Sequence, residues 1–192
     1  MLDDQIGFLI EADKLNTILR RNYTVAGDRR ENSAEHSWHV ALTAMVLAEH
    51  SNEPVKIDRV VRMLLVHDIV EIDAGDTFIY DSLANTSKEA REQEAAKRLF
   101  SLLPKPQPSE LRALWDEFET RATPEAKFAR AVDRFVAVLH NYATHGRGWK
   151  ENGITRSRVL AVNQRVAEGS ETLWAKIQEM TLEAVKRGDL SE

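Results

Sequence analysis

Apolar residues recur at three- and four-residue spacing along most of this chain, which is the period of an amphipathic helix. No stretch alternates apolar and polar residues for long enough to predict a strand. The pattern predicts about eight helices, over residues 4–20, 35–50, 59–72, 88–103, 109–118, 124–145, 156–168 and 171–187. A polar segment over 21–34 separates the first two. The sequence therefore predicts an all-α fold, a helical bundle.

Residues that typically cap helices stand at several of the predicted ends. Thr86-Ser87-Lys88-Glu89 matches a capping box, in which a hydroxyl and a carboxylate satisfy free N–H groups at a helix start. Asp58 and Ser109 stand at two further starts, and Thr123 precedes Pro124, a favoured residue in the first turn. Glycines follow three of the predicted helices, at Gly146, Gly169 and Gly188.

Length and composition fit one folded domain. The chain has 192 residues, of which 43% are hydrophobic and 30% are charged, as in globular proteins and unlike disordered ones. The turn at 105–108 is too short to link two domains, and the sequence has no internal repeat. We expect a single domain over residues 1–192.

Charge and residue usage exclude several kinds of partner and site. The net charge of -5 gives no global attraction for a nucleic-acid polymer or an anionic membrane. The absence of cysteine excludes disulfides and thiolate metal ligands. No apolar run approaches the roughly 18 residues of a membrane helix, and the first residues are acidic where a signal peptide would be basic. We therefore expect a cytoplasmic protein.

Polar residues interrupt three of the predicted helices where apolar ones would be expected. His67-Asp68 follows the apolar run 63–66, His36 opens an apolar helix, and Asp133 lies among core residues in the middle of another. Charged groups are rarely buried without a partner, so two imidazoles and two carboxylates are candidates to meet at one place. This mixed N/O set suits one divalent ion of Mn, Fe, Co, Ni or Zn better than Ca²⁺.

Ordinary structural roles are the alternative for these residues. His36 alone would be a helix-start histidine, and Asp133 alone would pair with Arg130 or Arg134. The remaining histidines are expected to be structural, and they are His39, His50, His140 and His145. Of these, His39 lies one turn from His36. An alternative to a structural role for His39 is therefore that it supports the metal ligands without binding the metal.

The order His36, His67-Asp68, Asp133 resembles the H…HD…D signature of the HD superfamily. The flanking residues 30–37 and 67–76 resemble one branch, which holds the bacterial 5′-deoxynucleotidases and the HD domain-containing protein 2 group. The resemblance covers roughly residues 5–145. It implies a helical homodimer that hydrolyses deoxyribonucleoside 5′-monophosphates with one divalent metal. The metal-site core would span about 30–145, with C-terminal helices at 155–188 packed on it.

The resemblance also implies roles for individual residues. The metal ligands would be His36, His67, Asp68 and Asp133. Glu71 would handle the attacking water or the leaving-group proton, and Asp76 would contact the sugar hydroxyl. The phosphate-binding arginine falls on Arg21, with Arg20 as the alternative. The family usually has a tryptophan beside this arginine, whereas this chain has Asn22-Tyr23.

These roles are chemically complete for hydrolysis of a phosphate monoester. A metal lowers the pKa of its water, and the metal and an arginine stabilise charge on the phosphate. Glu71 lies four residues after His67, so both side chains are expected on one helix face. HD enzymes with two metals carry extra histidines before the last aspartate, but no histidine lies between His67 and His140.

Three functions remain open at this stage. The leading hypothesis is a 5′-nucleotidase acting on deoxyribonucleoside 5′-monophosphates. One alternative is an HD phosphohydrolase for another small phosphate ester, and the other is a non-catalytic helical dimer that binds a metal or nucleotide. Glu71 and Asp76 favour catalysis, because a structural metal site needs neither. The sequence leaves the native metal and the preferred base open.

Overall fold

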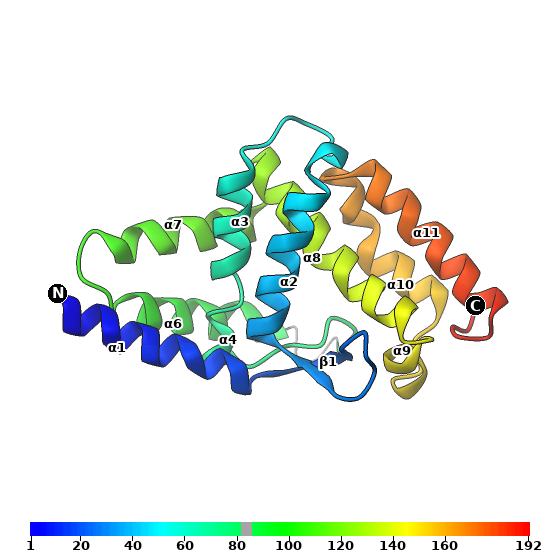
Figure 1. Ribbon diagram of the computed structural model, residues 1–192, viewed down its shortest axis with the longest axis horizontal. Coiled ribbons are helices and arrows are strands. Elements are labelled where there is room, and N and C mark those ends of the chain that lie inside the picture. The colour runs from blue at the N-terminus through cyan, green and yellow to red at the C-terminus, as the bar shows by residue number, and fades with distance from the viewer. Residues whose placement is uncertain (82–85) are drawn as a thin grey trace.

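The helices surround one long central helix, α8 (Pro124–Ala143), as Figure 1 shows. The computed structural model describes residues 1–81 and 86–192. Among the helices packed against α8 are α2 (Ser33–Val46), α3 (Ile57–Val66), α7 (Gln107–Thr120) and α11 (Glu171–Lys186). One hydrophobic core joins these elements and includes residues from Phe8 to Leu190. The predicted all-α bundle is confirmed, apart from one small sheet.

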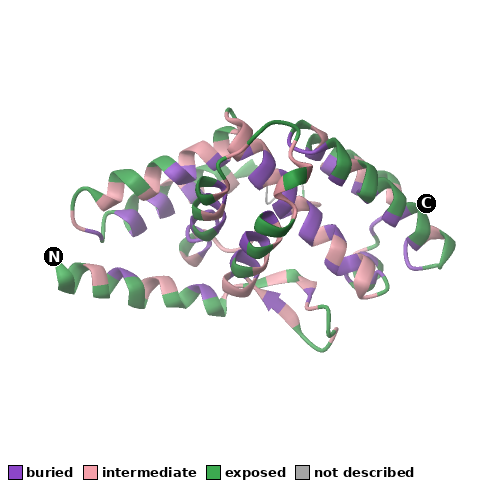
Figure 2. Cartoon of the chain, turned by 45° about the horizontal axis from the view of Figure 1, so that its top comes forward, coloured by how far each residue is buried: buried purple, intermediate pink, exposed green. Residues whose placement is uncertain are grey.

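The central helix begins as its sequence predicts. Thr123 Oγ1 accepts a hydrogen bond from the backbone N–H three residues further on, over 3.2 Å, and Pro124 occupies the first helical position. The helix ends near the predicted position, with Thr144 as its C-cap. Side chains on its inward face are buried, as Figure 2 shows in purple, and include Phe128, Val132 and Val136. Burial of these apolar groups holds α8 in the core.

The N-terminal segment differs from the predicted helix over 4–20. Helix α1 (Leu2–Asp13) is followed by a 3₁₀ turn over Lys14–Thr17 and by the antiparallel strands β1 (Leu19–Tyr23) and β2 (Arg30–Asn32). The expectation of no strand was therefore wrong. Strands this short carry too few alternating positions to show in the sequence pattern, and their pairing with each other stabilises them. Successive side chains of β1 now point to opposite faces.

A capping box begins α2, whereas the predicted box at 86–89 does not form. Asn32 Oδ1 accepts from the Glu35 N–H over 3.0 Å, and Glu35 Oε1 accepts from the Asn32 N–H over 2.8 Å. Helix α6 (Lys88–Phe100) has Ser87 as its N-cap, without a side-chain capping bond. The N-cap positions of α3 and α7 are also not the expected Asp58 and Ser109. They are Lys56 and Pro106, neither of which makes a side-chain capping bond.

The predicted helix over 59–72 is broken after Val66. Hydrogen bonds between residues three apart carry the chain onward, such as Glu71 N to Asp68 O over 2.9 Å, and α4 (Glu71–Ala74) follows. In such a tight turn side chains three residues apart eclipse each other, so Glu71 lies in line with Asp68. Gly75, with φ 74° and ψ 153°, then turns the chain toward Asp76.

The C-terminal elements pack on and beside the central helix. They comprise α9 (Arg147–Glu151), α10 (Arg156–Asn163), the 3₁₀ segment Gln164–Glu168 and α11. They contact the central helix directly, except for α10, which packs on its C-terminal neighbours. Gly146 precedes α9 with φ 69°, and a Cβ there would lie 1.8 Å from Asp189 O. Ser170 caps α11, with Gly169 before it, as the sequence predicts for the break between the last helices. Among the described residues, no helix is both long and apolar enough to cross a membrane.

Candidate active site

The four predicted metal ligands meet where the break after α3 faces the start of α2 and the middle of α8. Ligand atoms of His36, His67 and Asp133 all lie within 4.8 Å of one another. His36 Nε2 is 3.1 Å from Asp133 Oδ1. His67 Nε2 is 3.0 Å from Asp68 Oδ1 and 3.9 Å from Asp133 Oδ1. All four side chains are buried, as the helix pattern predicts.

His67 is held in the form that a metal requires. Its Nδ1 lies 2.7 Å from Leu64 O, and only an N–H can donate to a carbonyl, so Nε2 carries the lone pair. That Nε2 is buried and has no hydrogen-bond partner among the described residues. Burial lowers the pKa of His67, so the ring stays neutral. A backbone carbonyl that fixes the tautomer is typical of histidines that bind metals.

The remaining donors also fit a divalent cation. Burial and the charge of Arg20 both lower the pKa of His36, but the carboxylates of Asp133 and Glu31 outweigh them and raise it to about 9. The pKa of Asp133 is lowered far below its usual range, against the effect of burial, chiefly through His36. A proton therefore occupies the space between His36 and Asp133, and a cation can displace it. Two imidazoles and two carboxylates suit a transition metal.

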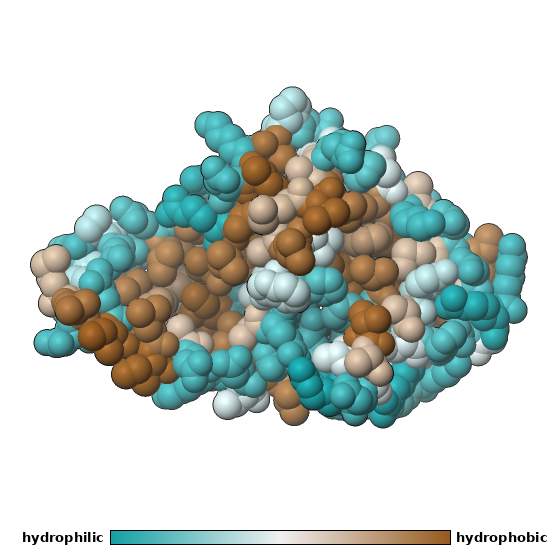
Figure 3. All heavy atoms as spheres, viewed as in Figure 1, coloured by the Kyte–Doolittle hydropathy of each residue, from teal (hydrophilic) through white to brown (hydrophobic). Residues whose placement is uncertain are grey.

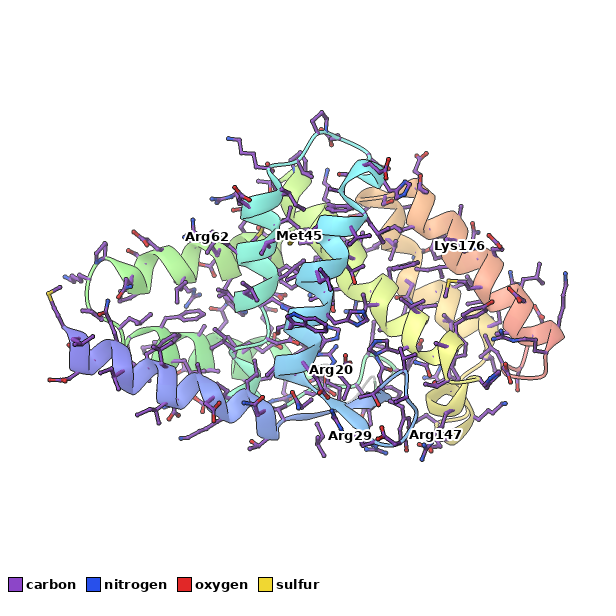
Figure 4. All side chains as sticks on the ribbon, viewed as in Figure 1. Arg20, Arg29, Met45, Arg62, Arg147 and Lys176 are labelled. Atoms are coloured by element: carbon purple, nitrogen blue, oxygen red, sulfur yellow. The ribbon has the colours of Figure 1, made fainter. Side chains whose placement is uncertain are left out.

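The strand register decides which arginine reaches this cluster. Arg20 Nη1 donates to Asp68 Oδ2 over 2.8 Å and lies 3.8 Å from both Glu71 Oε1 and Asp76 Oδ1. Figure 4 labels Arg20 at the lower end of α2, between the hairpin and the bundle. Arg21 is exposed on the opposite face of β1, with its guanidinium 5.9 Å from the centre of the Phe78 ring. The sequence had favoured Arg21, but Arg20 lies among the carboxylates.

Glu71 and Asp76 are close enough to the cluster to act on a bound molecule. Ser33 Oγ donates to Glu71 Oε2 over 2.6 Å, which holds the buried carboxyl in place. Burial and the nearby charge of Asp68 raise the pKa of Glu71 to about 8. Burial also raises the pKa of Asp76. A carboxyl that holds its proton near neutral pH can serve as a general acid.

Two adjoining pockets open at the cluster. The first, here called the polar pocket, is lined by the ligands His67, Asp68 and Asp133, by Glu71 and by basic side chains that include Arg20, Arg130 and Arg134. The second, here called the aromatic pocket, is lined by residues that include Asn22, Phe78, Tyr80, Trp149 and Asn163. Arg20, Asp76, Thr77 and Arg134 line both pockets. Asp76 therefore lies where the two pockets join.

Some residues of the site were not expected from the sequence. Glu31 is buried and lies 3.2 Å from His36 Nδ1, although the segment 21–34 was expected to be a polar loop. His140 is also buried and lies 3.5 Å from Glu31, although a structural role was expected for it. It follows Asp133 by seven residues, so helical periodicity places both on one face of α8. That spacing was the available signal, whereas nothing local marked Glu31.

The comparison with protein families decides the fold family. The model of the HD domain matches residues 12–174. The chain belongs to the HD domain family. The crystal structure of a predicted metal-dependent phosphohydrolase from Magnetospirillum magnetotacticum MS-1 is similar to this structure, with a TM-score of 0.94. The two sequences are 51% identical, and the match covers 100% of this chain and 96% of that one. A conserved hypothetical protein from Pyrococcus furiosus, 19% identical over 90% of this chain and 99% of its own, shares the fold with a TM-score of 0.62.

Several curated relatives of this HD domain are named 5′-deoxynucleotidases. Human 5′-deoxynucleotidase HDDC2 is 37% identical over 111 residues, which is 58% of this chain and 53% of that protein. The fission yeast protein, 5′-deoxynucleotidase hdd1 of Schizosaccharomyces pombe, is 25% identical over 192 residues, covering 92% of this chain and 96% of its own. The match thus spans about half the length of the human relative and nearly all of the yeast one. The predicted membership of the HD superfamily is confirmed.

Proposed function

We propose that this HD domain is a metal-dependent phosphohydrolase that releases phosphate from deoxyribonucleoside 5′-monophosphates. The observation that carries the proposal is the polar pocket. It combines a free imidazole nitrogen, two ligand carboxylates, a carboxyl with a raised pKa and the guanidinium of Arg20. The names of the curated relatives support the same activity. A structural metal site needs neither an arginine nor an extra carboxyl, so the non-catalytic alternative is disfavoured.

In this proposal His36, His67, Asp68 and Asp133 hold the metal ion. The bound cation supplies Lewis acidity and a nucleophilic water at neutral pH. Arg20 binds equatorial phosphate oxygens, because a guanidinium matches the geometry of a phosphate and stays charged when buried. Glu71 takes a proton from the attacking water or gives one to the 5′-oxygen as its bond to phosphorus breaks. The products are a deoxynucleoside and inorganic phosphate.

Asp76 gives the proposal its sugar contact. Its carboxyl lies at the junction of the polar and aromatic pockets, where a sugar would sit if its 5′-phosphate occupied the polar pocket. It can accept a hydrogen bond from the 3′-hydroxyl. The aromatic pocket offers Phe78 and Tyr80 beside the nucleoside, although this chain has Asn22-Tyr23 near the arginine, where the family usually has a tryptophan. Apolar pockets with a few placed polar groups are typical of small-molecule sites.

A phosphate-release screen tests the proposal. The protein is stripped with EDTA and then assayed with Mn²⁺, Co²⁺ or Mg²⁺ on deoxyribonucleotides, ribonucleotides and a phosphate ester without a sugar. We expect release from deoxyribonucleoside 5′-monophosphates with at least one metal. Equal turnover of all esters would favour the broader phosphohydrolase, and no turnover of any ester would favour the non-catalytic dimer.

We also propose that a second copy of the chain covers an apolar surface on α2 and α3. Large apolar side chains gather there, as Figure 3 shows, and Trp38 and Met45 are 62% and 59% exposed. Leu42, Val46 and Leu65 extend this surface. Soluble monomers rarely expose contiguous apolar patches of this kind. Apolar surface of matching shape on an identical chain gives a twofold dimer.

Light scattering during gel filtration tests the dimer. The wild type is expected to elute at twice the chain mass, and Met45→Glu to elute as a monomer, because a buried unpaired charge disfavours the interface. Leu182→Glu is the matched control, since Leu182 is an apolar residue 43% exposed on α11. A monomeric wild type would contradict the dimer, as would equal effects of both substitutions.

Other expectations from the sequence belong to this proposal. The single domain over 1–192 is supported by the one hydrophobic core that reaches from Phe8 to Leu190. The identity of the metal, one of Mn, Co, Fe, Ni or Zn, stays a prediction. A cytoplasmic location also stays a prediction.

A further inference from the structure

Glu31 stands between two histidines, and the proposed reaction uses neither it nor the second histidine. The side chain of Glu31, at the end of the hairpin, is only 2% exposed. Its Oε2 lies 3.2 Å from His36 Nδ1, and its Oε1 lies 3.5 Å from His140 Nδ1. A buried carboxylate is costly unless donors face it. Glu31 therefore joins a metal ligand on α2 to a histidine on α8.

His140 continues this series of contacts to His39. His140 Nε2 lies 3.0 Å from His39 Nδ1. Their ring planes differ by 20° and their centres are 5.0 Å apart. The ring planes are thus nearly parallel, and the two facing nitrogens have the separation of an N–H···N hydrogen bond. His39 is only partly buried, and its ring stacks on Trp38.

The hydrogen bonds along Glu31, His140 and His39 determine which ring nitrogen of each histidine carries a proton. A carboxylate only accepts, so the Nδ1 atoms of His36 and His140 must both carry hydrogen. His140 Nε2 then accepts from His39 Nδ1, and a cation that displaces the proton between His36 and Asp133 would meet the Nε2 lone pair of His36. The two Nδ1 atoms and Glu31 Oε2 are buried and make no hydrogen bond of standard geometry among the described residues, so the groups that face one another over 3.2 Å and 3.5 Å are the ones available to satisfy them.

We propose that Glu31, His140 and His39 form a chain that positions His36 for metal binding, here called the Glu31 chain. By holding Nδ1 protonated, the chain directs the Nε2 lone pair of His36 toward Asp133. The inference rests on the proposed metal site. These three residues do not touch the metal or substrate, so they are positioning residues. Partners of this kind commonly change metal affinity by about 10- to 100-fold.

A second metal at Glu31, His39 and His140 is the competing explanation. Their ligand atoms also lie within 4.8 Å of one another. A single ion would need the lone pairs of both imidazoles to converge on it. Instead the two nitrogens face each other at a hydrogen-bonding distance of 3.0 Å, with room for one proton between them. The geometry favours the hydrogen bond.

Metal affinity of paired variants tests the chain. His140→Leu removes the donor to Glu31, and calorimetry is expected to show about tenfold weaker Zn²⁺ binding. His140→Asn places an amide N–H where Nδ1 lies, so its affinity should stay within about threefold of the wild type. Glu31→Gln should weaken binding by about 10- to 100-fold, because its amide N–H meets an imidazole N–H. His50→Gln, off the chain, is the control. Thermal unfolding confirms that each variant is folded.

Imidazole tautomers give a second readout that a merely structural role would not move. In the Zn²⁺-loaded protein, nitrogen-15 NMR should show that Nδ1 of His36 is protonated. In the metal-free protein, it should show that Nδ1 of His140 is protonated. Unchanged Zn²⁺ affinity in His140→Leu would overturn the chain, as would the opposite tautomer of His140. Two bound ions per chain, falling to one in His140→Leu, would establish the second metal instead. If the wild type binds no cation, the metal site fails, while the His140 tautomer still tests the chain.

Discussion

Arg20 Nη1 donates to Asp68 Oδ2 over 2.8 Å, so the guanidinium touches a carboxylate that we assign to the metal. This contact turns the other oxygen of Asp68 toward His67, whose Nε2 lies 3.0 Å away. Burial alone would lower the pKa of Arg20, but Asp68, Glu71 and Asp76 raise it above its usual range. A permanent positive charge therefore lies beside the metal site, where a phosphate would bind.

The first prediction separates the two arginines. Arg20→Gln should lower kcat/KM for a sugar-free phosphate ester by about ten- to a hundred-fold, the value of one charged hydrogen bond of about 1.5–3 kcal/mol. Arg21→Gln is the matched control and should change it by less than about threefold, because Arg21 lies beside Phe78 at the aromatic pocket and not among the carboxylates. Phosphate release measures kcat/KM for both variants. If Arg21→Gln loses more kcat/KM than Arg20→Gln, Arg21 is the phosphate-binding arginine, as the sequence favoured.

The second prediction separates metal binding from catalysis at Glu71. Glu71→Gln should keep the metal while kcat falls by about 10²–10⁴, the usual contribution of a positioned acid or base. Elemental analysis of the purified variant gives its metal content, and phosphate release gives kcat. If metal and activity disappear together, Glu71 is a ligand and its proposed role is wrong.

The third prediction concerns the sugar. Asp76→Asn should lower kcat/KM for deoxyribonucleoside 5′-monophosphates by about ten- to a hundred-fold, because a charged acceptor for the 3′-hydroxyl is lost. The same variant should hydrolyse a sugar-free ester nearly as well as the wild type. Equal losses on both substrates would show that Asp76 acts on the phosphate or on the fold.

The fourth prediction is a pH dependence of stability in the metal-free protein. Burial, then Asp68, raises the pKa of Glu71 from 4.5 to about 8. Between these values the folded state holds a proton that the unfolded state has released, so stability falls as pH rises, by about 1.4 kcal/mol per pH unit from this group. The stability that the protonated Glu71 carboxyl contributes is fully present below the pKa of 4.5 and is lost above the pKa of about 8.

Urea unfolding from pH 5 to 8 after EDTA treatment measures this effect. Glu71→Gln should gain stability relative to the wild type as pH rises, because it cannot ionise. Glu49→Gln, at an exposed position, is the control and should follow the wild type. Parallel curves for wild type and Glu71→Gln would contradict the raised pKa.

The side chains that we propose as metal ligands could be selected from the sequence because they interrupt helical apolar patterns. Asp133 lies between buried residues of α8, and His67-Asp68 follows buried residues of α3. Their positions depend on helix periodicity, which is local. The confirmed family added the expectation that they meet.

The parts of the fold and site that the sequence did not predict depend on contacts between segments that are distant along the chain. The hairpin of β1 and β2 turned an expected helix end into a strand, and that change of period exchanged Arg20 for Arg21 at the site. The break after Val66 likewise brought Glu71 under Asp68. Glu31 is buried only because α2 and α8 bring His36 and His140 to it. Such burial has no signature in the neighbouring sequence.

Metal-dependent phosphate release tests the central claim most directly. The wild type, stripped of metal with EDTA, is assayed on a deoxyribonucleoside 5′-monophosphate before and after Mn²⁺ or Co²⁺ is added, with bound metal measured in the same sample. We expect no activity before addition and recovery at one ion per chain, while Asp68→Ala, which loses a charged ligand, recovers neither. Full activity after exhaustive chelation would contradict the metal-dependent site, as would wild-type binding retained in Asp68→Ala.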